Sequence, residues 1–469
     1  MPLYLCLDQG GHASRALVLD GQGTEVARAV REVATRLPAP DQVEQDPEEV
    51  VSSVAAAARA VLTALGPRRD ELRAAGLATQ RSSIVCWDRI TGAALSPVIS
   101  WQDRRAADWL AQFTPQRAEI ERRTGLRLSP HYGCSKLRWC LQHLEAVRAA
   151  QQERRLAVGP LASFLAFRLL EERPLVVDPS NAQRTLLWNL AQRDWDPWLL
   201  ELFGVPRELL PQARATRDSF GHLAIDDEPV PLTIVTGDQA AALFGFGQPR
   251  PEAAYLNLGT GAFAQRVCTQ PVQVDGLLTG IAFQFDEQAT YTLEGTVNGA
   301  GAALTWAVRH LDLPNLEERL PAWLERDAEV PLFLNGIGGL GAPYWVADFE
   351  SRFIGVGEPW QEAVAVAESI VFLIAVILER GREAAPAATL MVSGGLAHLD
   401  GLCQRLADVT GLPVWRAAAH EATARGLAWL LAGGPPWPAP PGTDFTPRAG
   451  TAVATRYHAW RKEMQRRCV

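Results

Sequence analysis

Short apolar runs that each end at a glycine-containing turn recur along the chain. The runs, each with the turn that follows it, are Leu3–Leu7 with Asp8–Gly11, Ala16–Leu19 with Asp20–Gly23, Ala254–Leu258 with Gly259–Gly261, and Thr389–Val392 with Ser393–Gly395. Apolar runs bounded by such turns are typical of β-strands. The chain therefore opens on a predicted strand, turn and strand, and the same arrangement recurs where Ala262–Ala264 follows the third turn.

Longer stretches between these strands are predicted to be helical. Asp46 stands directly before Pro47, and an Ala- and Val-rich stretch continues from there to Leu65. An aspartate cap followed by proline at the first helical position marks a helix start. Ala363–Arg380 is a second predicted helix, whereas the proline-rich Gly434–Pro447 is expected to be a loop. Strands that alternate with helices indicate the α/β class.

The chain is long enough for more than one domain. It has 469 residues, and a domain commonly takes about 100–200 residues. Because the strand-turn-strand arrangement appears early and again after residue 250, we expect two similar lobes, residues 1–245 and 246–469.

Composition narrows the class of partner. The chain has 45 Lys+Arg against 53 Asp+Glu, a net charge of −8, which argues against a nucleic-acid partner because phosphate binding needs a basic face. The longest apolar run, Ile370–Leu378, is short for a membrane span. Asp8 interrupts the apolar N-terminus, and the 7 cysteines form no CxxC pair. We therefore expect a cytoplasmic enzyme that binds neither nucleic acid nor membrane.

The turns and strand ends carry residues suited to phosphate chemistry. Glycine turns let backbone N–H groups approach phosphate oxygens. Asp8, at the end of the first predicted strand, has an oxygen ligand suited to Mg²⁺, although the same residues also suit a plain hairpin turn. Asp238 follows the apolar Leu232–Val235 and is a candidate proton acceptor in phosphoryl transfer. Its alternative role is to cap the helix that begins at Gln239.

Polar and aromatic residues elsewhere suit a polyol or sugar. Arg81 is a candidate donor to substrate hydroxyls, and Trp101 with Asp103 pairs an aromatic face with a carboxylate. The alternatives are a solvated arginine and a core tryptophan beside a helix start, which is the commoner situation.

Ordered sequence blocks along nearly the whole chain resemble the FGGY carbohydrate kinases, and within that family the glycerol kinases. The blocks are Leu7–Gly10 with Ser14–Ala16, Val43–Pro47, Thr79–Arg81, Trp87–Asp88 with Thr91–Gly92, Trp101–Gln102 with Arg104–Arg105, Asp178 with Asn181–Ala182 and Arg184–Thr185, Trp195–Asp196, Gly237–Gly245, Leu258–Gly261, Leu293–Gly295, Gly339–Trp345 and Ser393–Gly395. Of these, Gly237–Gly245 is the most specific.

The resemblance implies two actin-like (ribonuclease-H-like) lobes that close over ATP and a small polyol or sugar, with Mg²⁺. It implies Asp238 as the catalytic base and Asp8 as the metal-organising carboxylate. The positions implied for phosphate and nucleotide are Gly10, Gly11, His12, Arg15, Gly259, Thr260, Gly261, Gly394 and Gly395. The positions implied for substrate are Arg81, Ser82, Trp101, Asp103, His131, Gln239 and Phe263.

Several residues depart from the family pattern. Gly11 and His12 replace two threonines of the first phosphate loop, so two hydroxyl donors are lost. Ser82 stands where the glycerol kinases have glutamate, and His131 where they have tyrosine. Asp103 is typical of the pentulose kinases instead. These changes favour a substrate other than glycerol, since a site built to bond hydroxyls discriminates among them.

Three interpretations of function follow from the sequence. The first is an active kinase that moves the γ-phosphoryl group of ATP to a hydroxyl of a small polyol or ketose. The second is a pentulose kinase of the xylulose or ribulose type. The third is a non-catalytic sensor of sugar or nucleotide that has kept the fold. The sequence leaves the nucleotide preference open, as it does the choice between monomer and homodimer.

Overall fold

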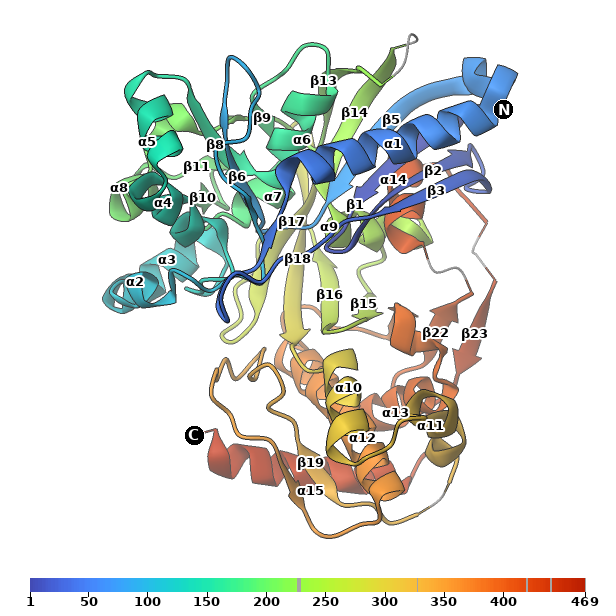
Figure 1. Cartoon of the computed structure of the whole chain (residues 1–469). Coiled ribbons are helices and arrows are strands. Elements are labelled where there is room, and N and C mark those ends of the chain that lie inside the picture. The colour runs from blue at the N-terminus through green and yellow to red at the C-terminus, as the bar shows by residue number, and fades with distance from the viewer. Residues whose placement is uncertain (226–228, 327, 419–420, 439–440, 469) are drawn as a thin grey trace.

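The computed structural model describes residues 1–225, 229–326, 328–418, 421–438 and 441–468. In Figure 1 the chain forms two α/β lobes, the N-terminal one at the top and the C-terminal one at the bottom. The N-terminal lobe is built on a six-stranded sheet in the order β13-β14-β5-β1-β2-β3. The C-terminal lobe is built on a seven-stranded sheet in the order β17-β18-β16-β15-β21-β22-β23.

The N-terminal sheet starts with the predicted strand-turn-strand. Its strands are β1 (Leu3–Gln9), β2 (Ala13–Asp20), β3 (Glu25–Glu32), β5 (Leu72–Thr79), β13 (Arg217–Leu223) and β14 (Val230–Gly237). β1, β2 and β3 form an antiparallel meander, whereas β5 runs parallel to both β1 and β14. The carboxyl ends of β1, β5 and β14 therefore meet at one edge of the sheet.

The C-terminal sheet repeats this plan. Its strands are β15 (Ala253–Leu258), β16 (Ala262–Cys268), β17 (Leu278–Phe285), β18 (Gln288–Val297), β21 (Thr389–Ser393), β22 (Val414–Ala417) and β23 (Gly442–Phe445). β15 pairs antiparallel with β16 and parallel with β21, as β1 does with β2 and β5. The sequence is correct in predicting β15, β16 and β21, but β23 lies in the segment predicted to be a loop and pairs with β22.

Further elements complete each lobe. In the N-terminal lobe they include a four-stranded sheet of β4 (Glu44–Gln45), β7 (Val98–Ile99), β6 (Ile84–Asp88) and β8 (Leu156–Pro160), and helices α1 (Pro47–Leu65), α3 (Arg117–Thr124), α4 (Gly133–His143), α5 (Glu145–Gln152), α6 (Leu161–Leu169), α7 (Pro179–Gln183) and α8 (Pro197–Phe203). In the C-terminal lobe they include helices α10 (Gly301–His310), α11 (Leu316–Leu324), α12 (Pro359–Arg380), α13 (Asp400–Thr410) and α15 (Ala452–Arg467). Asp46 caps α1 as predicted, accepting from the backbone N–H groups of Glu48 and Glu49.

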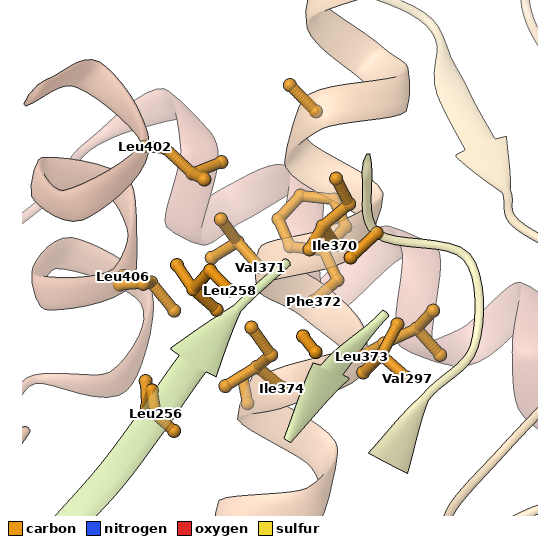
Figure 2. Packing of buried hydrophobic residues seen from close by; sticks show 14 of the residues in the cluster. Leu256, Leu258, Val297, Ile370, Val371, Phe372, Leu373, Ile374, Leu402 and Leu406 are labelled. Carbon is orange, nitrogen blue, oxygen red and sulfur yellow. The ribbon is translucent and has the colours of Figure 1, made fainter. Parts of the chain in front are cut away.

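Helix α12 forms the centre of the C-terminal core. Figure 2 shows its residues Val371 and Ile374 beside Leu256 and Leu258 of β15. Both α12 and the segment 47–71, which contains α1, have the length and apolar composition of a membrane span. In α12, however, 83% of the most apolar 18-residue stretch is buried inside the protein, so the apolar surface of this helix already packs against the rest of the lobe.

Two short helices join the lobes. α9 (Asp238–Leu243) follows β14, α14 (Ala422–Leu431) follows β22, and both belong to one apolar cluster that includes residues of both large sheets. Gly426 packs so closely that a Cβ atom there would lie 1.8 Å from the carbonyl oxygen of Ala241. The backbones of α9 and α14 therefore touch.

Candidate active site

Asp238 is the first residue of α9, directly after the last residue of β14. Its Oδ1 accepts a hydrogen bond from the backbone N–H of Gln239 at 2.7 Å, and Thr423 donates to its carbonyl oxygen at 3.4 Å. The residue at the helix cap position is Gly237, so the predicted alternative of Asp238 as the cap does not describe this geometry. Burial raises the pKa of the Asp238 carboxyl, and the charge of Arg81 opposes that rise.

Asp8 lies at the same edge of the sheet as Asp238. In the register of the parallel strands, Asp8 pairs with Ala78 of β5 and Gly237 pairs with Thr79 of β5. One strand therefore separates the two aspartates, a spacing of about 10 Å between the outer strands. Burial raises the pKa of Asp8 to about 7, with a further rise from the negative charge of Asp238, while Arg15, 3.5 Å away, lowers it.

Arg81 connects Asp238 to the rest of the site. It donates to Oε1 of Gln239, and its stem passes so close to Gly237 that a Cβ atom there would lie 2.5 Å from the Cδ of Arg81. On its other side, Arg81 lies 3.7 Å from a carboxylate oxygen of Glu294. Glycine at position 237 is thus needed for Arg81 to cross the end of β14.

Glu294, on β18, reaches across to the N-terminal lobe. Its Oε2 accepts from Arg184 at 2.5 Å, and its Oε1 accepts from Thr292 at 2.6 Å. Burial alone would raise the pKa of Glu294, but Arg184 and Arg81 together lower it to about 2. Glu294 lies in one of the sequence blocks that carry the resemblance to the family. The sequence alone does not show that it pairs with two distant arginines.

Trp101, His131 and Ser82 form a second part of the site. The rings of Trp101 and His131 lie 5.4 Å apart, and the backbone N–H of Trp101 donates to Ser83, next to Ser82, at 3.1 Å. Ser82 has a φ of 65°, a left-handed conformation that costs about 1–3 kcal/mol in a residue other than glycine. Lys136 donates to the carbonyl oxygens of both Ser82 and His131 and so holds them together.

The surroundings of Asp103 differ from those expected of a substrate-binding residue. Its side chain is fully buried, and its oxygens accept from the guanidinium of Arg105 at 2.7 Å and from the backbone N–H of Val43 at 2.7 Å. Arg105 also pairs with Glu44. This geometry argues against the predicted contact of Asp103 with a substrate, because its carboxylate is already engaged inside the protein.

The first predicted phosphate loop is the turn between β1 and β2. It is closed by a hydrogen bond from the N–H of Gly10 to the carbonyl oxygen of Ala13 at 2.9 Å. The carbonyl oxygen of Gly11 accepts from Gln45 at 2.7 Å, which ties the turn to β4. His12 is exposed, and the Arg15 side chain is 37% exposed, so both are open to a ligand.

The predicted turns Gly259–Gly261 and Ser393–Gly395 meet at the corresponding edge of the C-terminal sheet. The N–H of Gly259 donates to the carbonyl oxygen of Gly261, and Thr260 at the tip is exposed. Gly394 has a φ of 94°, and a Cβ atom there would lie 2.6 Å from the carbonyl oxygen of Leu258. At Gly395 beside it, a Cβ atom would meet no other atom within 4 Å, which leaves space for a ligand.

A crevice lies between α9 and the C-terminal sheet. Its lining includes Gln239, Asn257, Phe263, Gln265 and Ser393. Gln239 and Phe263, predicted from distant parts of the sequence to share one site, therefore line the same crevice. Gln239 of this crevice directly follows Asp238 and accepts from Arg81, so a carboxylate and an arginine lie next to it, and such groups suit transfer of a phosphoryl group to a hydroxyl.

Comparison with known proteins gives the family. The N-terminal domain of the FGGY family of carbohydrate kinases matches residues 3–245, and its C-terminal domain matches residues 254–433. A glycerol kinase of Xanthobacter autotrophicus is 35% identical over 444 residues, which cover 91% of this chain and 89% of that protein. A glycerol kinase of Polaromonas naphthalenivorans is 36% identical over 447 residues, 92% of this chain and 90% of that protein.

Solved structures show the same fold at lower identity. Plasmodium falciparum glycerol kinase with ADP superposes with a TM-score of 0.89 at 22% identity, covering 100% of this chain and 99% of that one. Ligand-bound xylulose kinase from Lactobacillus acidophilus gives a TM-score of 0.85 at 19% identity, covering 99% and 98%. These confirm the predicted two-lobed α/β ATPase architecture, and the chain belongs to the FGGY family of carbohydrate kinases, phosphotransferases that act on an alcohol group.

Proposed function

We propose that the chain transfers the γ-phosphoryl group of ATP to a hydroxyl of a small polyol or ketose, with Asp238 as the base. The observation that carries this proposal is the position of Asp238, at the carboxyl edge of the N-terminal sheet, beside Arg81 and Gln239 and one strand away from Asp8. A carboxylate in such a position accepts the proton of a hydroxyl as its oxygen attacks phosphorus.

In this reaction the substrate oxygen forms a bond to the γ-phosphorus while the bond from that phosphorus to ADP breaks. The hydroxyl proton passes to Asp238. Arg81 and Gln239 orient the substrate in this proposal, since they bond to each other beside Asp238 and the arginine has further N–H donors. In-line placement and charge stabilisation supply most of the acceleration in such reactions.

The nucleotide phosphates are assigned to the glycine turns. We place the β- and γ-phosphates at Gly10, Gly11, His12 and Arg15 of the first loop and at Gly259–Gly261 of the second, and the adenosine side at Gly394 and Gly395. The exposure of His12, Thr260 and Gly395 supports this assignment. The two threonines missing from the first loop are offset in part by the His12 ring.

The residues present also suit Mg²⁺. The Asp8 carboxylate supplies the hard oxygen ligand that this ion prefers, and its only ion-pair partner among the described residues is Arg15, at 3.5 Å. When bound there, Mg²⁺ would neutralise charge on the phosphates. Asp8 itself would hold the ion, while Arg15 balances the carboxylate.

The substrate is assigned to Arg81, Ser82, Trp101, His131, Gln239 and Phe263. The curated relatives are named glycerol kinases, but Ser82 and His131 change the polar groups that a glycerol pocket would offer, and we propose a different polyol or a ketose. A pentulose is the nearest alternative, although the burial of Asp103 removes the residue that favoured it.

The proposal is tested by a screen of ATP consumption with polyols, pentuloses, hexuloses, aldoses and the corresponding sugar acids, each with and without Mg²⁺. We expect at least one to give a phosphorylated product, detected by mass spectrometry, and the rate of its formation to fall by about 10²–10⁴-fold with Asp238→Asn. If no compound is phosphorylated while ATP and a sugar both bind, the chain is a sensor and the catalytic proposal fails.

The division into lobes at residues 1–245 and 246–469 is part of this proposal. It places the base in the first lobe and the second phosphate turn in the other. A cytoplasmic location and a homodimer stay predictions from the sequence.

A further inference from the structure

Lys136 lies directly behind two residues of the proposed substrate site. Its Nζ donates to the carbonyl oxygen of Ser82 at 3.1 Å and to that of His131 at 2.6 Å. The lysine is only 1% exposed. A buried lysine Nζ therefore lies behind the backbone of both residues.

The neighbouring buried arginines each have a carboxylate partner. Arg105 pairs with Asp103 at 2.7 Å. Arg184 pairs with Glu294 at 2.5 Å, and Arg81 lies 3.7 Å from the same Glu294 while also facing the charge of the catalytic aspartate. These charges are balanced within the protein.

Lys136 differs from them. Across the described ranges of the chain, no carboxylate lies within ion-pair distance of its Nζ, and its two hydrogen bonds go to neutral carbonyl groups. Burial lowers the pKa of the Lys136 ammonium, the charge of Arg104 lowers it further, and the paired Asp103 acts in the opposite direction. A negative charge beside Lys136 would favour its protonated form, for which the described residues supply no ion-pair partner, so this part of the site favours an anionic ligand.

Ser82 and His131 also offer unused hydrogen-bonding groups. The Ser82 hydroxyl is buried without a hydrogen-bond partner. Neither ring nitrogen of His131 bonds to any residue that the structure describes, and the ring is partly exposed beside Trp101. Burial lowers the pKa of His131 well below its ordinary value, with nearby cations adding to this, so the neutral ring keeps one N–H to donate. An acceptor that carries a negative charge would satisfy both groups.

We propose that the substrate is a polyhydroxy carboxylate whose carboxylate group binds Ser82 and His131 in the field of the buried Lys136. This inference rests on the proposed function, because it names the substrate class of that site. Ser82 and His131 donate to the carboxylate oxygens, and Lys136 acts as a positioning residue that supplies the compensating charge. The carboxylate itself is unchanged in the reaction. A hydroxyl elsewhere on the same carbon chain gives its proton to Asp238 as its oxygen bonds to phosphorus and ADP departs.

Matched pairs of compounds test the proposal directly. The two members of each pair differ only by a carboxylate in place of a terminal CH₂OH. The pairs are D-glycerate with glycerol, D-xylonate with xylitol, and D-gluconate with D-glucitol. We expect the carboxylate of at least one pair to have a kcat/KM about 10- to 100-fold above its neutral partner, as charge-assisted hydrogen bonds would give. Equal or higher kcat/KM for the neutral partner in every pair would overturn the proposal.

Variants at Ser82 separate charge from shape. Ser82→Glu places a carboxylate beside Lys136, and we expect it to reverse the preference toward the neutral partner of the same pair. Ser82→Ala removes only the hydroxyl, and we expect it to weaken the preference for the carboxylate without reversing it. An unchanged preference in both variants would show that Ser82 does not face the substrate carboxylate.

A binding measurement keeps this inference distinct from the proposed function. Calorimetry with the same pairs, on protein saturated with a nonhydrolysable ATP analogue, reports binding without transfer. If carboxylates bind more tightly than their neutral partners but none is phosphorylated, the proposed function fails and the charge inference stands. If neutral compounds are phosphorylated and carboxylates neither bind nor react, the inference fails and the proposed function stands. If neither kind binds, both fail.

Discussion

Asp238 combines burial with a nearby cation, and this combination sets the pH at which it can act as a base. Burial raises the pKa of its carboxyl above the ordinary value of 3.8, and Arg81 opposes the rise. A raised pKa means that the proton is retained to a higher pH, so the base is lost as the pH falls through that pKa. The structure therefore predicts that the decline of activity on the acid side is shifted to higher pH than for an ordinary aspartate.

We expect kcat/KM to fall on the acid side with an apparent pKa above 3.8. Arg81→Gln removes the opposing charge, so the same limb should move to higher pH even though the variant binds substrate less well. Both profiles are measured by steady-state kinetics with the substrate found in the screen. An acid limb at or below 3.8 in the unaltered protein, or one that moves downward in the variant, would contradict the assignment.

Single residues of the site are easier to predict from the sequence than their partners. The ends of predicted strands, and the sequence blocks that resemble the family, identify Asp8, Asp238 and Arg81. The buried position of Asp103 was not predictable, because a carboxylate in a sequence does not reveal that Arg105 and the N–H of Val43 already occupy it. The pairing of Glu294 with Arg184, 110 positions away, and that of Lys136 with Ser82, 54 positions away, join distant parts of the chain and so leave no local signal.

At the scale of elements, the contact between α9 and α14 holds Asp238 in place. Gly426 of α14 faces the backbone of α9, where a Cβ atom would lie 1.8 Å from the carbonyl oxygen of Ala241. Gly245, just after α9, similarly faces the carbonyl oxygen of Ala422 at 2.6 Å. Neither neighbour is a flexible side chain, so a larger residue must push the helices apart.

Gly426→Ala is therefore expected to lower the free energy of unfolding by about 1–3 kcal/mol, the usual cost of overpacking. Chemical denaturation followed by circular dichroism measures the change. Gly395→Ala is the matched control for stability, because a Cβ atom there would meet no other atom within 4 Å. A loss of stability in the control as large as in Gly426→Ala would show that close packing is not the cause.

The strands and long helices were predictable where local signals were strong. The aspartate and proline at the start of α1 mark the beginning of the helix within a single turn of it. The glycine turns after β1 and β15 likewise mark the ends of those strands. β23 was not predictable, because the prolines that precede it in the sequence suit a loop and its pairing with β22 depends on tertiary contacts. The tight crossing at Gly426 is likewise invisible in a sequence, since it involves backbone atoms of a segment some 180 positions away.

On the scale of the whole molecule, Glu294 links the two lobes. It extends from β18 of the C-terminal sheet and pairs with Arg184 and Arg81 of the N-terminal lobe. The predicted division near residue 245 stays a prediction, because α9 and α14 pack into a cluster shared by both sheets. A buried pair at this position influences both stability and the placement of Arg81.

Glu294→Gln should lower the free energy of unfolding by about 3–5 kcal/mol near neutral pH, because it leaves buried arginines without their carboxylate. The pKa of Glu294 is lowered from 4.5 to about 2, so its stabilising contribution is present above 4.5 and is lost as the pH falls through 2. The difference between the two proteins, from thermal unfolding at several pH values, should shrink over that range.

Glu287→Gln is the control for this variant. Glu287 pairs with Arg193, but its side chain is 95% exposed, so its removal should change stability little. A loss of stability in Glu294→Gln no greater than in Glu287→Gln would contradict a structural role for the ion pair between the lobes.

The central claim is that Asp238 accepts the proton of the substrate hydroxyl, and Asp238→Asn tests it because the two side chains have the same shape. The decisive measurement is single-turnover phosphoryl transfer, paired with calorimetric binding of the nucleotide to the same protein. We predict that transfer falls by about 10²–10⁴-fold while nucleotide affinity stays nearly unchanged. Transfer at the rate of the unaltered protein would contradict the claim.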